Sequence, residues 1–141
     1  VYDRFKIYRP LADKYTKWRN NLTPYDIQGY EQLPKKGDLL IITKSMKDVM
    51  CLYEMGYTAI SPASESTFLT PDVIDALKLR FKRILICFDR DVPGVKNMRK
   101  ISLKTGLNGF LVHKKFQSKD ISDAIKNNGF EVIKNWLKET L

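Results

Sequence analysis

The chain has 141 residues, 43% of them hydrophobic and 29% charged, a composition that fits one folded domain and excludes an intrinsically disordered chain. Its 25 lysines and arginines against 16 acids give a formal net charge of +9, which favours a polyanionic partner such as nucleic acid. No apolar run approaches the roughly 20 residues that span a bilayer, and the N-terminus lacks a signal-peptide core, so we expect a cytoplasmic location and no membrane partner.

The first 36 residues carry no long helical period, and their prolines, asparagines and glycine predict short strands and turns. Basic and aromatic residues are interleaved in two stretches of this segment, 4–9 and 14–19. Such a mixture suits single-stranded nucleic acid, because charges hold phosphates while bases stack on the rings, and we expect Arg9 to contact a phosphate. The alternative is a solvated strand pair whose aromatic rings belong to the core.

From residue 37 onward, apolar strands alternate with amphipathic helices. We expect strands over 39–43, 57–61, 83–88 and 109–113, and helices over 46–55, 71–80 and 93–104. Thr70 as N-cap and Pro71 at the first helical position mark one helix start. The alternation implies parallel strands joined by right-handed crossovers, with helices on both faces. The fold class is therefore α/β, a Rossmann-like open parallel sheet of about four strands preceded by a short β-rich segment.

The C-terminal part, residues 119–141, predicts one or two helices broken near Gly129, with apolar residues at helical spacing. The two cysteines, Cys51 and Cys87, belong to no Cys-x-x-Cys or Cys/His cluster, and His113 is the single histidine. We therefore expect reduced core cysteines and no zinc in this chain.

The most informative stretch runs from Ile84 to Gly94, where an apolar strand ends in Asp89 and Asp91 and a helix follows. Alternate residues of an extended strand share a face, so the two carboxylates project the same way, about 7 Å apart. Mg²⁺ prefers oxygen ligands and usually takes one or two protein carboxylates beside substrate phosphates, so the pair indicates a metal site for phosphoryl transfer. The alternative is that Asp91 caps the helix begun by Pro93, with Asp89 a solvated strand end.

A second strand-to-helix unit, residues 38–52, carries Lys44 at its turn and Asp48 near the start of its helix. Carboxyl ends of neighbouring parallel strands converge on one crevice, which is where open α/β sheets bind ligands. We therefore expect Lys44, Asp48, Asp89 and Asp91 to share one site.

The order of these segments resembles the Toprim domain shared by bacterial-type primases, type IA and II topoisomerases and some nucleases. Its marks are a Glu after the first strand, usually as Glu-Gly-x-x-Asp, and an Asp-x-Asp after the third. Residues 44–48 (Lys-Ser-Met-Lys-Asp) and 89–94 (Asp-Arg-Asp-Val-Pro-Gly) stand at these marks, and 119–123 (Lys-Asp-Ile-Ser-Asp) is similar to the Lys-Asp-Pro-Asp stretch of primases. Residues 5–10 and 27–34 also resemble the segment that leads into the fold in phage-type primases and primase-helicases.

The resemblance implies the Toprim portion of a phage-type or mobile-element DNA primase, a nucleotidyltransferase that uses Mg²⁺ or Mn²⁺ to join ribonucleotides on single-stranded DNA. It implies metal ligation by Asp89, Asp91 and Asp120, with Asp48 as a further catalytic or supporting acid and Asp123 as a less central one. The implied partners are single-stranded DNA, ribonucleoside triphosphates and a replicative helicase domain. The alternative for Asp120 and Asp123 is a capping pair that opens the last helix.

The chain departs from the family at Lys44, which stands where the catalytic Glu is expected. The acid best placed to replace it is Glu65, just beyond the second strand and so at the same sheet edge; the alternative is that Glu65 is an ordinary polar loop residue. Lys44 itself can contact a phosphate as a point charge, and we assign the same role to Lys47, Arg90 and Lys119.

Two further functions remain open on the sequence. One is a non-catalytic nucleic-acid-binding Toprim-like module in which Lys44 has replaced acid chemistry by phosphate binding, and the other is a Toprim nuclease. We expect residues 1–36 to end a primase N-terminal subdomain, 37–125 to form the Toprim domain and 126–141 to form a C-terminal helix. Because bacterial-type primases usually carry an upstream zinc module and this chain starts at Val1, we expect a fragment of a longer protein.

Overall fold

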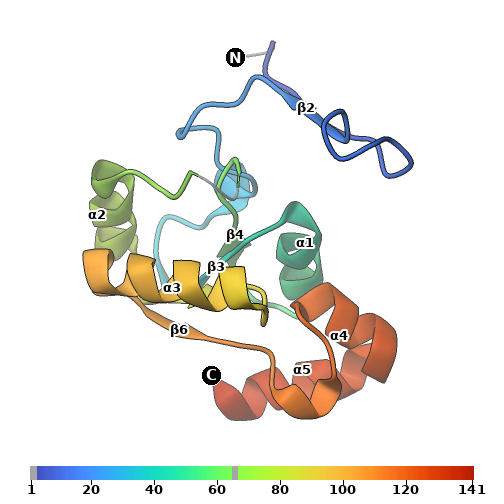
Figure 1. Ribbon diagram of the computed structural model, residues 1–141. Helices are drawn as coiled ribbons and strands as arrows, with labels where there is room; N and C mark the ends of the chain where they lie inside the picture. The colour runs from blue at the N-terminus through green and yellow to red at the C-terminus, as the bar shows by residue number, and fades with distance from the viewer. Residues whose placement is uncertain (1–2, 65–66) are drawn as a thin grey trace.

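A parallel β-sheet forms the centre of the computed structural model, which describes residues 3–64 and 67–141 (Figure 1). In the described part of the chain the sheet has four strands in the order β4-β3-β5-β6. Their bounds are β3 Gly37–Thr43, β4 Ala59–Ile60, β5 Phe81–Cys87 and β6 Asn108–Phe110. All three strand pairings are parallel, as the alternation of strands and helices predicts.

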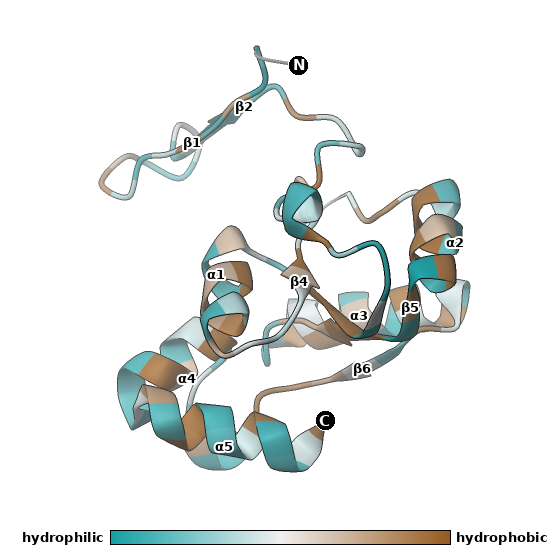
Figure 2. Ribbon diagram, turned by 180° about the vertical axis from the view of Figure 1, so that it is seen from behind, coloured by the Kyte–Doolittle hydropathy of each residue, from teal (hydrophilic) through white to brown (hydrophobic). Residues whose placement is uncertain are grey.

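Helices cover both faces of this sheet. Helices α1 (Met46–Glu54), α4 (Ile121–Asn128) and α5 (Phe130–Thr140) pack on one face, and α2 (Pro71–Arg80) and α3 (Val92–Thr105) on the other. Figure 2 shows the hydrophobic strands enclosed between the helices, whose outer sides are largely hydrophilic. The predicted α/β class with helices on both faces is therefore confirmed.

Successive residues of the two central strands supply the two core layers in turn. Leu40 and Ile42 of β3 join Ile86 of β5 under α2 and α3, while Ile41 and Cys87 face α1, α4 and α5. This period of two is the strand pattern expected when a sheet is buried on both faces. The cysteines are free thiols, as predicted, and burial raises the pKa of Cys87 far above its ordinary value.

The element bounds agree closely with the sequence-based ones, and the reasons are local. Helix α2 begins after Thr70 with Pro71 in its first turn, as predicted. Helix α3 ends at Gly106 in the left-handed conformation, with φ of 74°. Two strands differ from the prediction. Strand β4 is limited to Ala59–Ile60 within the predicted 57–61. Strand β6 stops at Phe110, and His113 instead precedes a short 3₁₀ turn, η2 (Lys114–Phe116), where its Nδ1 accepts the Lys115 amide.

The N-terminal segment forms an antiparallel hairpin, β1 (Lys6–Tyr8) with β2 (Trp18–Asn20), that stands away from the sheet (Figure 1). A 3₁₀ turn, η1 (Tyr30–Gln32), follows near the sheet. The strands and turns predicted here are confirmed, but the assignment of the hairpin aromatics to the core is wrong. Tyr8 and Trp18 are each 50% exposed and stack on one another with ring centroids 4.5 Å apart.

Within the described residues, no helix is long and apolar enough to cross a membrane.

Candidate active site at the strand ends

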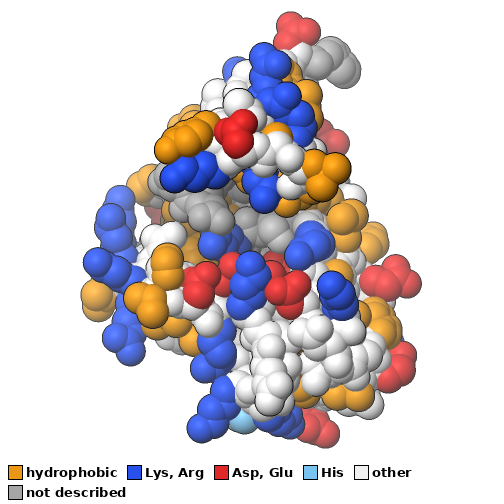
Figure 3. All heavy atoms as spheres, turned by 45° about the vertical axis from the view of Figure 1, so that its right-hand side comes forward, with side chains coloured by type: hydrophobic (Ala, Val, Ile, Leu, Met, Phe, Trp, Pro, Cys, Tyr) orange, Lys and Arg blue, Asp and Glu red, His pale blue; other side chains and the backbone are white. Residues whose placement is uncertain are grey.

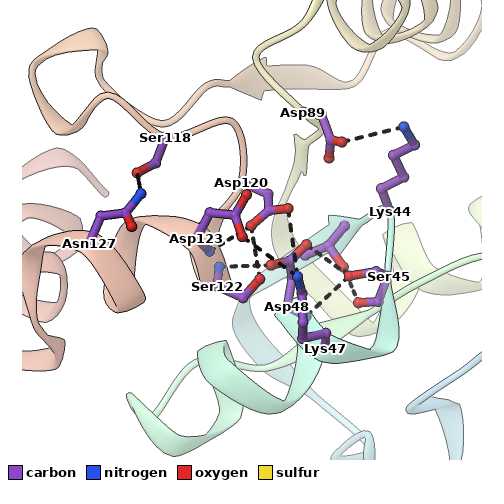
Figure 4. A network of polar contacts seen from close by, with 11 residues as sticks. Lys44, Ser45, Lys47, Asp48, Asp89, Ser118, Asp120, Ser122, Asp123 and Asn127 are labelled. Carbon is purple, nitrogen blue, oxygen red and sulfur yellow. Dashed lines mark hydrogen bonds and ion pairs between the residues drawn. The ribbon is translucent and has the colours of Figure 1, made fainter. Parts of the chain in front are cut away.

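Lys44 and Asp89 meet at the carboxyl edge of the sheet. Strands β3 and β5 are parallel neighbours, with Thr43 and Cys87 as register partners, so the residues that follow them emerge side by side. The Lys44 Nζ atom lies 3.5 Å from Asp89 Oδ2 (Figure 4), and the two side chains are largely buried. The structure therefore places Lys44 beside Asp89, while the shared functional role of Lys44, Asp48, Asp89 and Asp91 stays a prediction.

Asp48 joins helix α1 to helix α4. Its side chain is only 3% exposed, its Oδ2 accepts a hydrogen bond from the Ser45 hydroxyl at 2.9 Å, and its Oδ1 accepts one from the Ser122 amide at 2.9 Å. Ser45 also caps α1 by accepting the Asp48 amide. Because both carboxylate oxygens are engaged, Asp48 fixes the start of α4 against the start of α1.

Asp120 opens α4 as its N-cap, so the capping alternative holds for this residue. Its Oδ1 accepts the Asp123 amide at 2.7 Å and the Ser122 hydroxyl at 2.8 Å. The Lys47 Nζ atom lies 3.9 Å from Asp120 Oδ2 and 3.9 Å from Asp123 Oδ1. Figure 4 shows Asp120 and Asp123 beside Lys47. The cap uses Asp120 Oδ1, and Oδ2 is the oxygen that lies toward the Lys47 ammonium.

Asp91 is the N-cap of α3, as its own capping alternative predicts, and its Oδ1 accepts the Gly94 amide at 2.7 Å. The turn is tight, since a Cβ on Gly94 would lie 2.3 Å from the Asp89 carbonyl oxygen. Only glycine fits this approach, which explains the glycine five residues after Asp89. The cap uses one carboxylate oxygen of Asp91 and leaves Oδ2 outside it.

Arg90 and Lys119 hold the neighbouring loops together. The Arg90 amide donates to the Lys119 carbonyl at 2.7 Å, and its guanidinium Nε donates to the Val112 carbonyl. Their assignment to phosphate binding remains a prediction. Arg9 lies in the N-terminal hairpin with its guanidinium on the Thr16 carbonyl, and Glu65 lies outside the described residues.

Asp48, Asp89 and Asp120 form an acidic cluster in which the pKa values of Asp48 and Asp89 are raised. Burial raises the pKa of Asp89, the Lys44 ammonium partly opposes that rise, and the charge of Asp120 adds to it. Burial also raises the pKa of Asp48, again with Asp120 adding to the effect. Figure 3 shows acidic side chains gathered across the middle of one face with Lys and Arg side chains around them. Buried like charges of this kind are relieved by a bound cation.

The donor chemistry fits a hard divalent cation, because Asp89, Asp91 and Asp120 offer carboxylate oxygens at one end of the sheet. Over residues 3–64 and 67–141, no three acidic, histidine or cysteine side chains lie close enough together to hold a metal ion by themselves. A cation here would therefore need substrate phosphates and water to complete its coordination, as Mg²⁺ usually does.

Ser45 and Ser122 are the residues that the sequence interpretation missed. Both position Asp48, and the signal for Ser45 was present, since Ser-x-x-Asp is the capping-box spacing. No comparable signal marks Ser122, whose partner is 74 residues away.

The Asp48→Asn variant is expected to be more stable than the wild-type protein at pH 7, by on the order of 1 kcal/mol in free energy of unfolding. Asparagine can keep both hydrogen bonds, while the ionised carboxylate suffers burial and repulsion from Asp120. Because the folded-state pKa of Asp48 is raised, its protonation stabilises the wild type fully below the unfolded pKa of about 3.9 and this stabilisation is lost as pH rises through the folded pKa. The variant's advantage should therefore vanish at low pH, as urea unfolding at pH 7 and pH 3.5 will measure.

A matched control is Asp38→Asn, at an exposed ion pair with Lys82 that lowers the pKa of Asp38. Its effect should be small and of the opposite sign. A marked loss of stability in Asp48→Asn at pH 7 would mean that the charge of Asp48 supports the fold.

The comparisons with known proteins agree with this arrangement. The solved structures that the chain matches include a DnaG primase catalytic domain bound to single-stranded DNA (TM-score 0.68, 18% identity), the E. coli primase catalytic core (0.63, 18%) and the primase fragment of the bacteriophage T7 primase-helicase protein (0.52, 16%). These matches cover 96%, 94% and 79% of this chain but 50%, 51% and 47% of the three structures, so the chain spans about half their length.

Because the sequence identities are only 16–18%, the solved structures establish the fold alone. A search of curated proteins found no match. The sequence itself matches the family model described as Toprim-like over residues 41–125, more than half of the chain. That match includes the predicted site residues Lys44, Asp48, Asp89 and Asp91, together with the start of α4. The chain therefore belongs to the Toprim-like family.

Proposed function

We propose that this chain is the Toprim part of a DNA primase catalytic core, which joins ribonucleotides on single-stranded DNA in phage or mobile-element replication. The observation that carries the proposal is the acidic cluster of Asp48, Asp89 and Asp120, held at the carboxyl edge of a sheet with a primase-type fold. The T7 relative is named as a primase-helicase protein, which supports a helicase domain as a partner in the longer protein.

In this proposal Asp89, Asp91 and Asp120 hold Mg²⁺ or Mn²⁺ through carboxylate oxygens. The metal would neutralise triphosphate charge and stabilise the attacking and leaving oxygens of the transfer. Asp48 acts as a positioning residue, because its two hydrogen bonds fix the start of α4, where Asp120 lies. Such chemistry needs no nucleophilic side chain from the protein.

The lysines would receive the phosphates. Lys44 already lies against Asp89 and Lys47 against Asp120, so each ammonium is placed where a phosphate oxygen bound beside a metal would approach. Arg90 and Lys119 extend this positive charge along the adjoining loops. Glu65 remains a candidate for the acid that the family carries at the position of Lys44.

The N-terminal hairpin supports single-stranded DNA as the template. The Lys6 ammonium lies 4.9 Å from the Trp18 ring centroid and the Lys17 ammonium 5.7 Å from that of Tyr8, so charge and exposed rings share one small surface. Bases stack on such rings while the lysines attract the phosphates.

A non-catalytic DNA-binding module is the second candidate, and the contact between Lys44 and Asp89 favours it. An ammonium 3.5 Å from Asp89 Oδ2 already supplies positive charge that a metal would otherwise provide. In this candidate the site binds a phosphate and no transfer follows.

Removal of divalent ions separates the two candidates. In the longer protein, EDTA is expected to abolish primer synthesis completely while DNA binding through the basic surface falls less than about threefold, since phosphate contacts by lysine need no metal. Primer formation and fluorescence anisotropy of a labelled oligonucleotide measure both in one buffer. If the longer protein binds DNA but makes no primers with Mg²⁺ or Mn²⁺ present, the non-catalytic module is the better description.

A further inference from the structure

A pocket of about 460 Å³ is lined by residues of α2 and α3 and by residues from the described parts of the segment after β4, 62–64 and 67–70. Its volume is that of a small-molecule site and many times the space of one water molecule. None of Asp48, Asp89, Asp91 and Asp120 lines it, and it reaches the strand-end site only at Lys44. It is therefore a second concave surface beside the acidic cluster.

The inner wall of the pocket is apolar and partly aromatic. Phe68 and Phe88 contact each other edge to face, with centroids 6.2 Å apart, and Ile74 of α2 and Ile101 of α3 complete the wall. Flat apolar walls of this kind suit a planar ring, because stacked and edge contacts with aromatic side chains stabilise it. The ring of a nucleobase has this shape.

The rim of the pocket is basic. Lys78 of α2 and Lys100 and Lys104 of α3 line it, and among the described lining residues Asp75 is the one acid. The Lys78 ammonium donates to the Thr105 carbonyl at 3.1 Å, which fixes one charge across the two helices. With Lys44 at the other end, the described part of the rim carries an excess of positive charge, which favours a ligand with several negative charges.

The wall of the pocket also contains the hydroxyl group of Thr70. The Thr70 hydroxyl, at the N-cap of α2, is buried without a hydrogen bond in the described part of the chain. A ligand with polar edges would supply a hydrogen-bond partner.

We propose that this pocket binds a free nucleoside polyphosphate, with the base against Phe68 and Phe88 and the phosphates on Lys78, Lys100 and Lys104. A purely apolar ligand would leave the lysines unused, and an inorganic anion would leave the apolar wall unused. The pocket adjoins the acidic cluster at Lys44 but contains none of the carboxylates of Asp48, Asp89, Asp91 and Asp120, so its occupancy can be measured without primer synthesis.

The test measures ATP binding to this chain by calorimetry in buffer containing EDTA, with inorganic tripolyphosphate as the comparison probe. Wild-type protein is expected to bind ATP at least tenfold more tightly than tripolyphosphate. The double variant Lys100→Glu/Lys104→Glu is expected to bind ATP at least tenfold more weakly than wild type, as loss of two phosphate contacts requires.

The matched control is Lys126→Glu/Lys138→Glu, which makes the same charge change at exposed positions of α4 and α5 on the other face of the sheet. ATP affinity in the control should stay within about threefold of wild type, and circular dichroism will confirm that both variants fold. Absence of ATP binding, equal losses in the two double variants, or equal affinity for ATP and tripolyphosphate would each overturn the proposal. EDTA removes the divalent ions that the proposed primase chemistry needs, so this binding measurement is independent of that chemistry.

Discussion

In the longer protein, replacing Asp89 by asparagine is expected to lower the rate of primer synthesis about 10²- to 10³-fold. This is the usual effect of removing one group that stabilises charge in the transition state. Asp89 is 8% exposed and follows the central strand β5, so asparagine keeps its volume and position but loses the negative charge that a divalent cation needs. Binding of Mn²⁺, followed by electron paramagnetic resonance, should weaken in parallel. The fold should remain intact, because a neutral group at this buried site avoids the cost of burying a charge.

The control for this experiment is Asp38→Asn, which also removes one carboxylate charge but at an exposed ion pair at the start of β3. Its primer synthesis should stay within about twofold of wild type, since exposed ion pairs contribute little. Full activity in Asp89→Asn would eliminate the metal role of Asp89 and with it the proposed chemistry.

Replacing Lys44 by methionine is expected to raise the KM for ribonucleoside triphosphates by about 10- to 100-fold, the range for losing a charge-assisted hydrogen bond of about 1.5–3 kcal/mol. Methionine retains the length of the side chain, so the change isolates the ammonium beside Asp89. The effect on kcat should be smaller, because a phosphate contact made in both ground state and transition state acts on binding. Steady-state primer synthesis at varied nucleotide concentration separates the two constants.

The control is Lys82→Met, which removes the exposed lysine paired with Asp38 and should leave both constants unchanged. A fall in kcat with unchanged KM would instead make Lys44 part of the transfer step. Loss of DNA affinity with no change in KM would instead make Lys44 a contact of the DNA rather than of the incoming nucleotide.

Much of the fold is predictable from the sequence because its signals are local. Pro71 fixes the start of α2, where Thr70 stands at the N-cap position without a side-chain hydrogen bond, and the alternation of apolar residues in β3 and β5 reflects burial on both faces. The meeting of Lys44 and Asp89 is predictable for a different reason, since parallel neighbouring strands bring their carboxyl ends together whatever their separation in sequence.

The remaining features depend on tertiary packing that no short pattern encodes. The bond from Ser122 to Asp48 joins residues that only the folded chain brings together, and the pocket between α2 and α3 exists because their side chains leave space. His113 is a different case, because it lies beyond the end of β6 at Phe110 and caps a local 3₁₀ turn through a contact with the Lys115 amide. Capping and metal ligation also compete for the same residue type, and Asp91 and Asp120 show that one carboxylate can cap a helix and still present a second oxygen.

The two tryptophans of the sequence lie in different environments, one on the exposed hairpin and one in the core, so their fluorescence reports on two separate parts of the molecule. The sequence contains two tryptophans, and Trp18 on the hairpin is 50% exposed whereas Trp136 in α5 is 9% exposed among core residues. A base that stacks on the hairpin would quench the fluorescence of Trp18 and leave that of Trp136 unchanged. Unfolding would mainly shift the emission of Trp136, because Trp18 is already half exposed in the folded protein. Template contact and loss of the core can thus be followed separately in one unlabelled sample, with a Trp18→Phe protein to assign the signals.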